Sequence, residues 1–252
     1  NIFWKKEIED ILKTPIKIYN QNIILMFGDK ILSIDPISSN INWEYLYKGN
    51  QTFQSSGGDI ATFNNLLFFI LPNNVAGEID TIFGEKYDSV FSDIIFDNTY
   101  NSKIDKIHSY KNILSYLDDK KFLTSINIIN NDVVLNKAHI QNVNSFIFFR
   151  NSILTLHDNR ILKASNIINN NLFWNTDISE FLKEKDSIIH ATNYLNSIII
   201  FSQNGKILEV DSKTGIVISS KNLKINNAKS IYFNQNKIIF SQDNGKTSFF
   251  IQ

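Results

Sequence analysis

Three tryptophans occupy the same place in a short pattern that repeats along the chain. They lie in NIFWKKEIE (1–9), NINWEYLYK (40–48) and NLFWNTDIS (171–179). Related segments carry another residue there, and the six marked positions follow at intervals of 39, 48, 44, 39 and 45 residues: Trp4, Trp43, Phe91, Leu135, Trp174 and Ser219. Such a period predicts a repeat architecture in which each repeat is one supersecondary unit.

An aspartate or asparagine stands eight residues before most of the marked positions. Asp35 precedes Trp43, Asn166 precedes Trp174 and Asp211 precedes Ser219, with a short turn segment between. Asp and Asn at the start of a turn accept hydrogen bonds from nearby backbone N–H groups. We therefore interpret Asp35 and Asp211 as structural turn residues.

Two further strand signals lie ahead of each such frame. The first ends in a short polar turn, as in IKIYNQN (16–22), and the second is a continuous apolar run that ends in a tight turn, as in SIIIFSQNG (197–205). Asn204-Gly205 and Asn244-Gly245 predict two-residue type I′ hairpins, because both central residues of that turn need a positive φ. Each repeat is therefore predicted to form four antiparallel strands.

Four-stranded units at this period are typical of a β-propeller. A helical solenoid is excluded because no window keeps apolar residues at helical spacing for three turns, and DISEFLKEKDS (177–187) is expected to form a single turn. We predict one all-β propeller domain over 1–252 with six recognisable blades. The last unit (229–252) supplies three strands, so residues 1–9 are expected to add the fourth and close the ring.

Composition narrows the classes of function. The chain has 25 basic and 25 acidic residues, and only two of the basic ones, Arg150 and Arg160, are arginine. Nucleic acid is therefore not an expected partner, because phosphate recognition needs a basic excess. The absence of cysteine excludes disulfides and thiol chemistry. No apolar run reaches the roughly 18 residues of a membrane-spanning helix.

An aspartate, a glycine-containing turn and a tryptophan in this spacing resemble the PQQ-type propeller repeat. Residues 143–178 and the two units after them resemble the late blades of the BamB family, the propeller lipoproteins of the outer-membrane β-barrel assembly machine. That family usually has eight blades, so the resemblance leaves a longer ring open. It implies a non-catalytic scaffold on the periplasmic side of a bacterial outer membrane, held by a lipid anchor that lies outside this chain.

The same resemblance implies partners and contact residues. The partners would be a BamA-like assembly protein and, in addition, unfolded strands of outer-membrane proteins. The family's partner loop carries an Arg-Gly pair after leucines, and an acidic pair follows in the next interblade loop. The matching residues here, with Ser56 in place of the arginine, are Phe53, Gln54, Ser55, Ser56, Gly57 and Asp105.

Two other functions stay open at this stage. A PQQ-dependent dehydrogenase resembles the same repeat, but it needs a stacking floor for the quinone, oxygen ligands for Ca²⁺ and a catalytic aspartate. The adjacent cysteines that often cap the cofactor in those enzymes do not exist here. The other alternative is a propeller that binds a different protein or a peptide.

No cofactor or metal is predicted. The four histidines lie in different repeats without i, i+4 or short-loop pairing: His108, His139, His157 and His190. Gly245-Lys246-Thr247 resembles the end of a P-loop, but Phe240 stands where the first glycine would be needed. Gly57-Gly58 is followed by Asp59, whose charge repels phosphate, so we expect a tight interblade turn and then a strand there.

Overall fold

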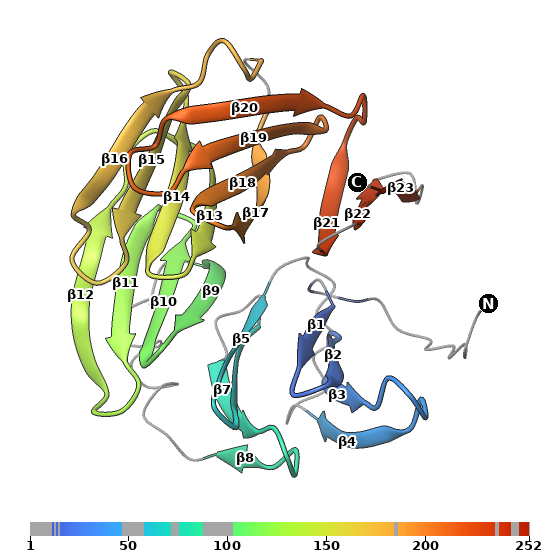
Figure 1. Cartoon of the computed structure of the whole chain (residues 1–252). Coiled ribbons are helices and arrows are strands. Elements are labelled where there is room, and N and C mark those ends of the chain that lie inside the picture. The colour runs from blue at the N-terminus through green and yellow to red at the C-terminus, as the bar shows by residue number, and fades with distance from the viewer. Residues whose placement is uncertain are drawn as a thin grey trace. The chain divides into compact units, whose positions relative to one another are not determined.

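The computed structural model describes residues 12, 14, 16–46, 58–71, 76–87, 103–183, 186–234, 237–242 and 247–251. These residues form antiparallel sheets connected in sequence order, five with four strands and one with three (Figure 1). The chain divides into two compact units, Asn1–His139 and Ile140–Gln252, with three sheets each. The all-β prediction and the four-stranded repeat are confirmed. Within the described residues, the chain forms no helix long and apolar enough to cross a membrane.

The N-terminal unit holds the first three sheets. Their strands are β1 (Lys17–Tyr19), β2 (Asn22–Met26), β3 (Lys30–Ile34) and β4 (Ile41–Leu46); β5 (Asp59–Phe63), β6 (Leu66–Ile70), β7 (Ala76–Asp80) and β8 (Lys86–Tyr87); and β9 (Ile104–Tyr110), β10 (Ile113–Asp118), β11 (Phe122–Asn127) and β12 (Asp132–His139).

The C-terminal unit holds the other three. Their strands are β13 (Val143–Phe149), β14 (Ser152–His157), β15 (Ile161–Asn166) and β16 (Leu172–Asp177); β17 (Ile188–Tyr194), β18 (Ser197–Ser202), β19 (Lys206–Asp211) and β20 (Val217–Asn222); and β21 (Ala228–Asn234), β22 (Lys237–Gln242) and β23 (Thr247–Ile251). The predicted closing strand, residues 1–9, lies outside the described residues, so ring closure stays a prediction.

The second strand of the second sheet, β6, is apolar on both faces because it packs on both sides. In β6, Leu67 and Phe69 join a core with the first sheet, whereas Phe68 and Ile70 join a core with the third. Alternate residues of a strand point to opposite faces, so one apolar run serves two cores. The second sheet therefore shares one core with each of its two neighbours.

The turn between the third and fourth strands has the same design along the chain. Asp35 Oδ1 accepts hydrogen bonds from the backbone N–H of Ile37 (2.9 Å) and Ser38 (2.6 Å), and Asp211 Oδ1 does the same for Lys213 (3.0 Å) and Thr214 (2.8 Å). The structural interpretation of Asp35 and Asp211 is confirmed. Equivalent side-chain oxygens come from Asp80, Asn127 and Asn166.

Each of the two described marker tryptophans packs on that turn of the following sheet. Trp43 Nε1 donates to the Thr81 carbonyl at 2.8 Å, and Trp174 Nε1 donates to the Ser212 carbonyl at 3.1 Å. Both indoles are buried. The predicted role of the tryptophan, to fill space between neighbouring sheets, is confirmed at these two positions. Trp4 lies outside the described residues.

The turn prediction at Asn204-Gly205 is wrong. Only Gly205 has a positive φ (76°), and its N–H donates to the Ser202 carbonyl at 3.1 Å, so three residues connect β18 and β19. Gly205 ends the turn in the left-handed region, as in hairpins with a bulge. Both loop residues are left-handed instead at Asn20 (46°) and Gln21 (63°), between β1 and β2. Asn244-Gly245 lies outside the described residues.

Strand pairing also corrects one marked position. Trp43 pairs with Ser33 and Trp174 with Ala164, two residues before the turn residue of each sheet. In the second sheet, Glu78 lies two residues before the turn residue Asp80 and pairs with Tyr87. Tyr87 therefore takes the position that the sequence analysis assigned to Phe91. Phe91 itself lies outside the described residues. The predicted single turn in 177–187 is confirmed by the bond from Leu182 N to the Ile178 carbonyl.

Candidate functional site

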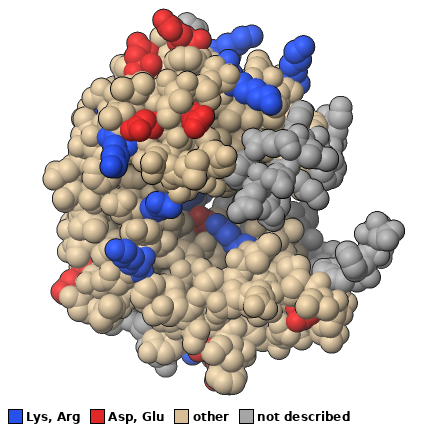
Figure 2. Space-filling view, in the orientation of Figure 1, with Lys and Arg blue, Asp and Glu red and all other residues tan. Residues whose placement is uncertain are grey.

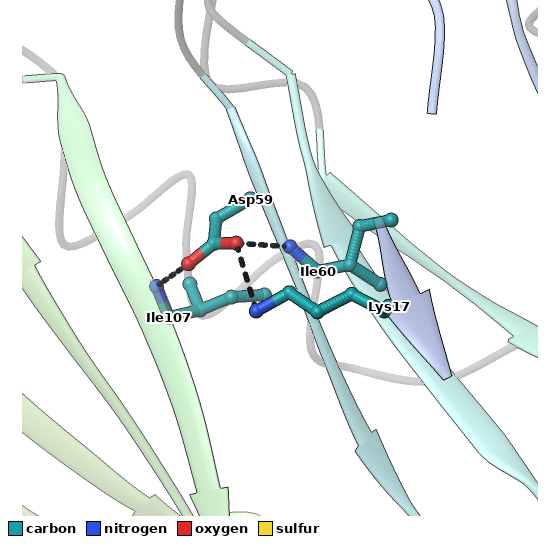
Figure 3. Close-up of polar contacts among 4 residues, drawn as sticks. All are labelled: Lys17, Asp59, Ile60 and Ile107. Carbon is teal, nitrogen blue, oxygen red and sulfur yellow. Dashed lines mark hydrogen bonds and ion pairs between the residues drawn. The ribbon is translucent and has the colours of Figure 1, made fainter. Parts of the chain in front are cut away.

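A buried carboxylate joins the first strands of all three sheets in the N-terminal unit. Asp59, the first residue of β5, is 8% exposed, and its Oδ1 accepts from Ile60 N (2.9 Å) and lies 3.6 Å from Lys17 Nζ of β1. Its Oδ2 accepts from Ile107 N of β9 at 3.2 Å, as Figure 3 shows. Because one side chain contacts β1 and β9 together, Asp59 positions these strands relative to β5.

A cavity of about 190 Å³ lies against the same three strands. Its wall includes Lys17 and Tyr19 of β1, Thr62 of β5, and His108 and Ser109 of β9. The Ser109 hydroxyl donates to the Thr62 carbonyl, and burial raises the pKa of the Tyr19 hydroxyl. The cavity is smaller than the roughly 300–1,000 Å³ of typical cofactor sites.

The predicted contact residues fall only in part on described structure. Phe53, Gln54, Ser55, Ser56 and Gly57 lie outside the described residues. Gly58 has a φ of 91°, and β5 begins at Asp59, so the expected strand is confirmed, whereas the turn before it stays a prediction. Asp105 lies in β9, two residues before Ile107. The Asp59–Ile107 bond therefore connects the end of the predicted loop to the strand that carries Asp105.

Apolar side chains are exposed at the turns of the N-terminal unit. The residue two positions after the turn Asp or Asn is isoleucine in four described turns, and three of these belong to the N-terminal unit: Ile37 (88% exposed), Ile82 (56%) and Ile129 (74%). Phe83 beside them is 70% exposed. The turn uses only the backbone N–H of this residue, and the fifth turn carries Lys213 there. The fold therefore does not require an apolar side chain at this position.

Charge is spread thinly over the face that Figure 2 shows. Lys and Arg side chains are interspersed with Asp and Glu among uncharged residues, and no broad patch of one sign is seen on that face. This distribution agrees with the equal numbers of basic and acidic residues in the sequence. A surface of this kind offers shape and apolar contact rather than a strong electrostatic field.

The histidines have separate surroundings. His157 is buried with its Nε2 atom 3.0 Å from Thr155 Oγ1, and burial is the main cause that lowers its pKa. His139 packs on the Phe122 ring and His190 on the Phe201 ring. Across the described part of the chain, no three His, Asp or Glu side chains are grouped so that they could hold a metal ion.

Sequence reasoning missed three features of these surfaces. Asp59 entered only as a residue that repels phosphate, and Lys17 and the turn isoleucines had no role. The isoleucines could have been found, because aligning the repeats on their turn residue places them in one column. The Lys17–Asp59 contact could not, because it depends on strands more than 40 residues apart lying next to each other.

Comparison with known proteins identifies the fold of the chain. No protein-family model and no curated protein sequence matches the chain. The chain is similar in structure to BamB from Moraxella catarrhalis, with a TM-score of 0.66, 13% identity, and coverage of 98% of this chain and 72% of that one. It is also similar to BBS1N crystallised in complex with ARL6DN, with a TM-score of 0.64, 8% identity, and coverage of 91% and 74%.

A third similar structure is a computationally designed protein, Ika8, with a TM-score of 0.54, 11% identity and 97% coverage of each chain. Together with the repeated four-stranded sheets, these likenesses assign the chain to the β-propeller fold. At these identities they establish the fold alone. The function is therefore argued from the surfaces.

Proposed function

We propose that the chain is a non-catalytic, protein-binding propeller that serves as a BamB-like accessory factor in the assembly of outer-membrane β-barrel proteins. The likeness to BamB over 98% of the chain supports this reading, as does the likeness to BBS1N, which was crystallised with a protein partner. The PQQ-type spacing in the sequence points in the same direction. A propeller suits the role because it presents loops on a rigid frame.

The observation that carries the protein-binding part is the set of exposed apolar side chains on the turns of the N-terminal unit. Ile37, Ile82, Phe83 and Ile129 are all more than half exposed, although their turns are held by backbone hydrogen bonds that any residue could make. A contiguous exposed apolar patch marks an interaction surface, and we propose that these four residues, at the same turn of three successive sheets, form one. We define these four residues as the turn surface.

We further propose a BamA-like assembly protein as the partner, on the periplasmic side of a bacterial outer membrane, with lipid anchoring through a segment outside this chain. Unfolded strands of outer-membrane proteins are a second proposed ligand. By resemblance, the contact loop is 53–57 with Asp105. The chain from β4 to β5 joins the strand ends opposite the turn surface, so the loop and the turn surface can be tested separately.

The first experiment is a pull-down of the chain with the periplasmic domains of the BamA protein from the same organism. The turn-surface variant carries Ile37→Asp and Ile82→Asp, and the loop variant carries Phe53→Asp and Ser55→Asp. Ile168→Asp is the matched control, because Ile168 holds the same turn position in the C-terminal unit. We expect at least about tenfold weaker binding for whichever variant removes the contact surface.

The result separates the alternatives. Retention that neither variant nor the control changes would contradict both proposed surfaces. Absence of retention by a folded chain would leave a propeller that binds another protein or a peptide. A PQQ absorbance shift in the presence of Ca²⁺, together with dye reduction on alcohols or sugars, would contradict the non-catalytic assignment.

A further inference from the structure

A larger cavity lies in the C-terminal unit, between the fourth and fifth sheets. Its volume is about 390 Å³, within the range of small-molecule sites. The walls come from the turn after β13, from β16 and from the turn after β19. They bring together three aromatic side chains, Phe149, Phe173 and Trp174, with two cationic ones, Arg150 and Lys213.

The cationic groups come from different sheets. Arg150 follows β13, and its guanidinium carbon lies 5.7 Å from the centre of the Phe149 ring, so the aromatic ring supports the charged group at the cavity. Lys213 belongs to the turn of the fifth sheet, whose Ser212 carbonyl receives the Trp174 indole N–H. The tryptophan contact therefore fixes the turn that carries Lys213 next to the wall that carries the rings.

No aspartate or glutamate lines this cavity among the described residues. The nearest turn carboxylate, Asp211, accepts from the Thr214 N–H, the Thr214 hydroxyl and the Lys213 N–H. These bonds, the Thr214 backbone bond first, lower its pKa, and Lys213 adds a smaller electrostatic contribution. Asp211 therefore offsets part of the Lys213 charge, and its Oδ1 atom accepts all three of the bonds within the turn.

Comparison of equivalent positions shows why the space stays open and free of acid. In the fifth sheet, Glu209 bonds to Ser197 at 3.0 Å and to Ser219 at 2.9 Å. The same place in the fourth sheet is Ala164, which pairs with Trp174 and lines the cavity. An alanine here leaves room and contributes no negative charge.

From these observations we infer that the cavity binds a small organic anion, a carboxylate or phosphate attached to an aromatic group. The aromatic group would lie against Phe173 and Trp174, and the anionic group would face Arg150 and Lys213. A guanidinium provides paired donors that match either kind of oxyanion. This site is independent of the proposed partner surfaces, which belong to the N-terminal unit.

The test is calorimetric titration of the full chain with phenylacetate, phenyl phosphate and the neutral analogue phenylacetamide. For ligands of this size, we expect one of the two anions to bind with a dissociation constant on the order of 1 mM. Phenylacetamide should bind at least about tenfold more weakly, because it lacks the charge. The tighter anion identifies whether the site prefers carboxylate or phosphate.

Arg150→Gln should weaken the tighter anion about tenfold without changing the unfolding midpoint. Lys111→Gln is the matched control, because Lys111 holds the equivalent turn position in the third sheet and lies 5.7 Å from the Tyr110 ring. It should leave binding unchanged. Equal affinity for phenylacetamide, equal losses in the two variants, or no saturable binding of either anion to the folded chain would each overturn the proposal.

Discussion

The tryptophans and the turns they touch depend on each other at single positions. The fifth residue of the turn, counted from the Asp or Asn, has a left-handed φ in all five described turns: Ser39, Gly84, Asn131, Asn170 and Gly215. Of these five residues, only Gly84 and Gly215 are glycine, and their turns are the two that contact a described tryptophan. A Cβ at Gly84 would lie 2.6 Å from the Trp43 Cβ, and one at Gly215 would lie 2.5 Å from a Trp174 ring carbon. The indole therefore requires glycine at these two positions, because non-glycine residues adopt the same backbone conformation in the other three turns.

Gly84→Asn should lower the free energy of unfolding by about 1–3 kcal/mol. Asparagine tolerates the left-handed backbone, so the loss would report the collision with Trp43 rather than φ strain. Ser39→Asn is the control, since its φ is 62° and the expected change is within about 0.5 kcal/mol. Urea unfolding measures both, and equal effects would show that the tryptophan contact does not explain the glycine.

The free energy of unfolding should depend on pH through Asp211, and the hydrogen bonds of its turn determine the sign of that dependence. Hydrogen bonds, that from the Thr214 N–H first, lower its pKa below the ordinary 3.8, so the ionised form is favoured by folding. Its stabilising contribution is present above pH 3.8 and is lost as the pH falls through the lowered pKa. Asp211→Asn should therefore make the decline of the unfolding free energy on acidification shallower.

The reverse variant, Asn166→Asp, should steepen that decline, because Asn166 accepts the same kind of bond from Ile168 N in the fourth sheet. Urea unfolding at several values between about pH 2 and 5 measures both slopes. Unchanged slopes in both variants would show that these turns do not contribute to acid unfolding.

Among the elements, the first strands of the N-terminal unit depend on one buried carboxylate. Asp59→Ala removes the acceptor of the Ile107 N–H in a buried position and should cost about 1–3 kcal/mol. Lys17→Met should cost less than about 1 kcal/mol, because the Lys17 side chain is 41% exposed and the ion pair is 3.6 Å long. Denaturant unfolding of the single and double variants separates the hydrogen bond from the ion pair. A larger loss for Lys17→Met would contradict this order.

The strands themselves were largely predictable, and the reasons are physical. Apolar runs such as Leu66–Ile70 become strands buried on both faces, and side-chain oxygens at Asp35 or Asn166 set turns through local bonds. Turn types were less predictable because Asn-Gly fits both a two-residue hairpin and a bulged turn, and Gly205 adopts the second. The prediction of Phe91 as the marked residue of the second sheet was wrong, because the segment from the turn residue to the marked residue is shorter in that sheet. Tyr87 is the residue that lies opposite Glu78.

For the whole molecule, the fold could be predicted from the sequence, whereas the cavity could not. A period is a property of the sequence, so the propeller prediction agrees with the fold that the comparisons support. The cavity between the fourth and fifth sheets depends on Arg150 and Lys213, which lie more than 60 residues apart in the sequence and meet only after the sheets pack. Each residue lies in a turn of the repeat, but the local pattern of one turn does not indicate that the two turns line one cavity.

The prediction of one domain over 1–252 has a thermodynamic consequence. Four of the described cores are each shared by two sheets, as for Ile24 with Phe69 in one unit and Leu154 with Leu208 in the other, so a sheet that unfolds exposes its neighbour. If the repeats form a single propeller, this coupling extends along the whole chain. We expect one urea transition, with the same midpoint reported by Trp43 and by Trp174.

Two variants that each retain one of these tryptophans, with the other two replaced by phenylalanine, would give the two fluorescence signals. Each midpoint is compared with far-ultraviolet circular dichroism of the same variant, because each substitution also changes stability. Agreement within each variant would support one cooperative domain. A fluorescence transition that precedes the loss of strand signal would show that Asn1–His139 and Ile140–Gln252 unfold separately.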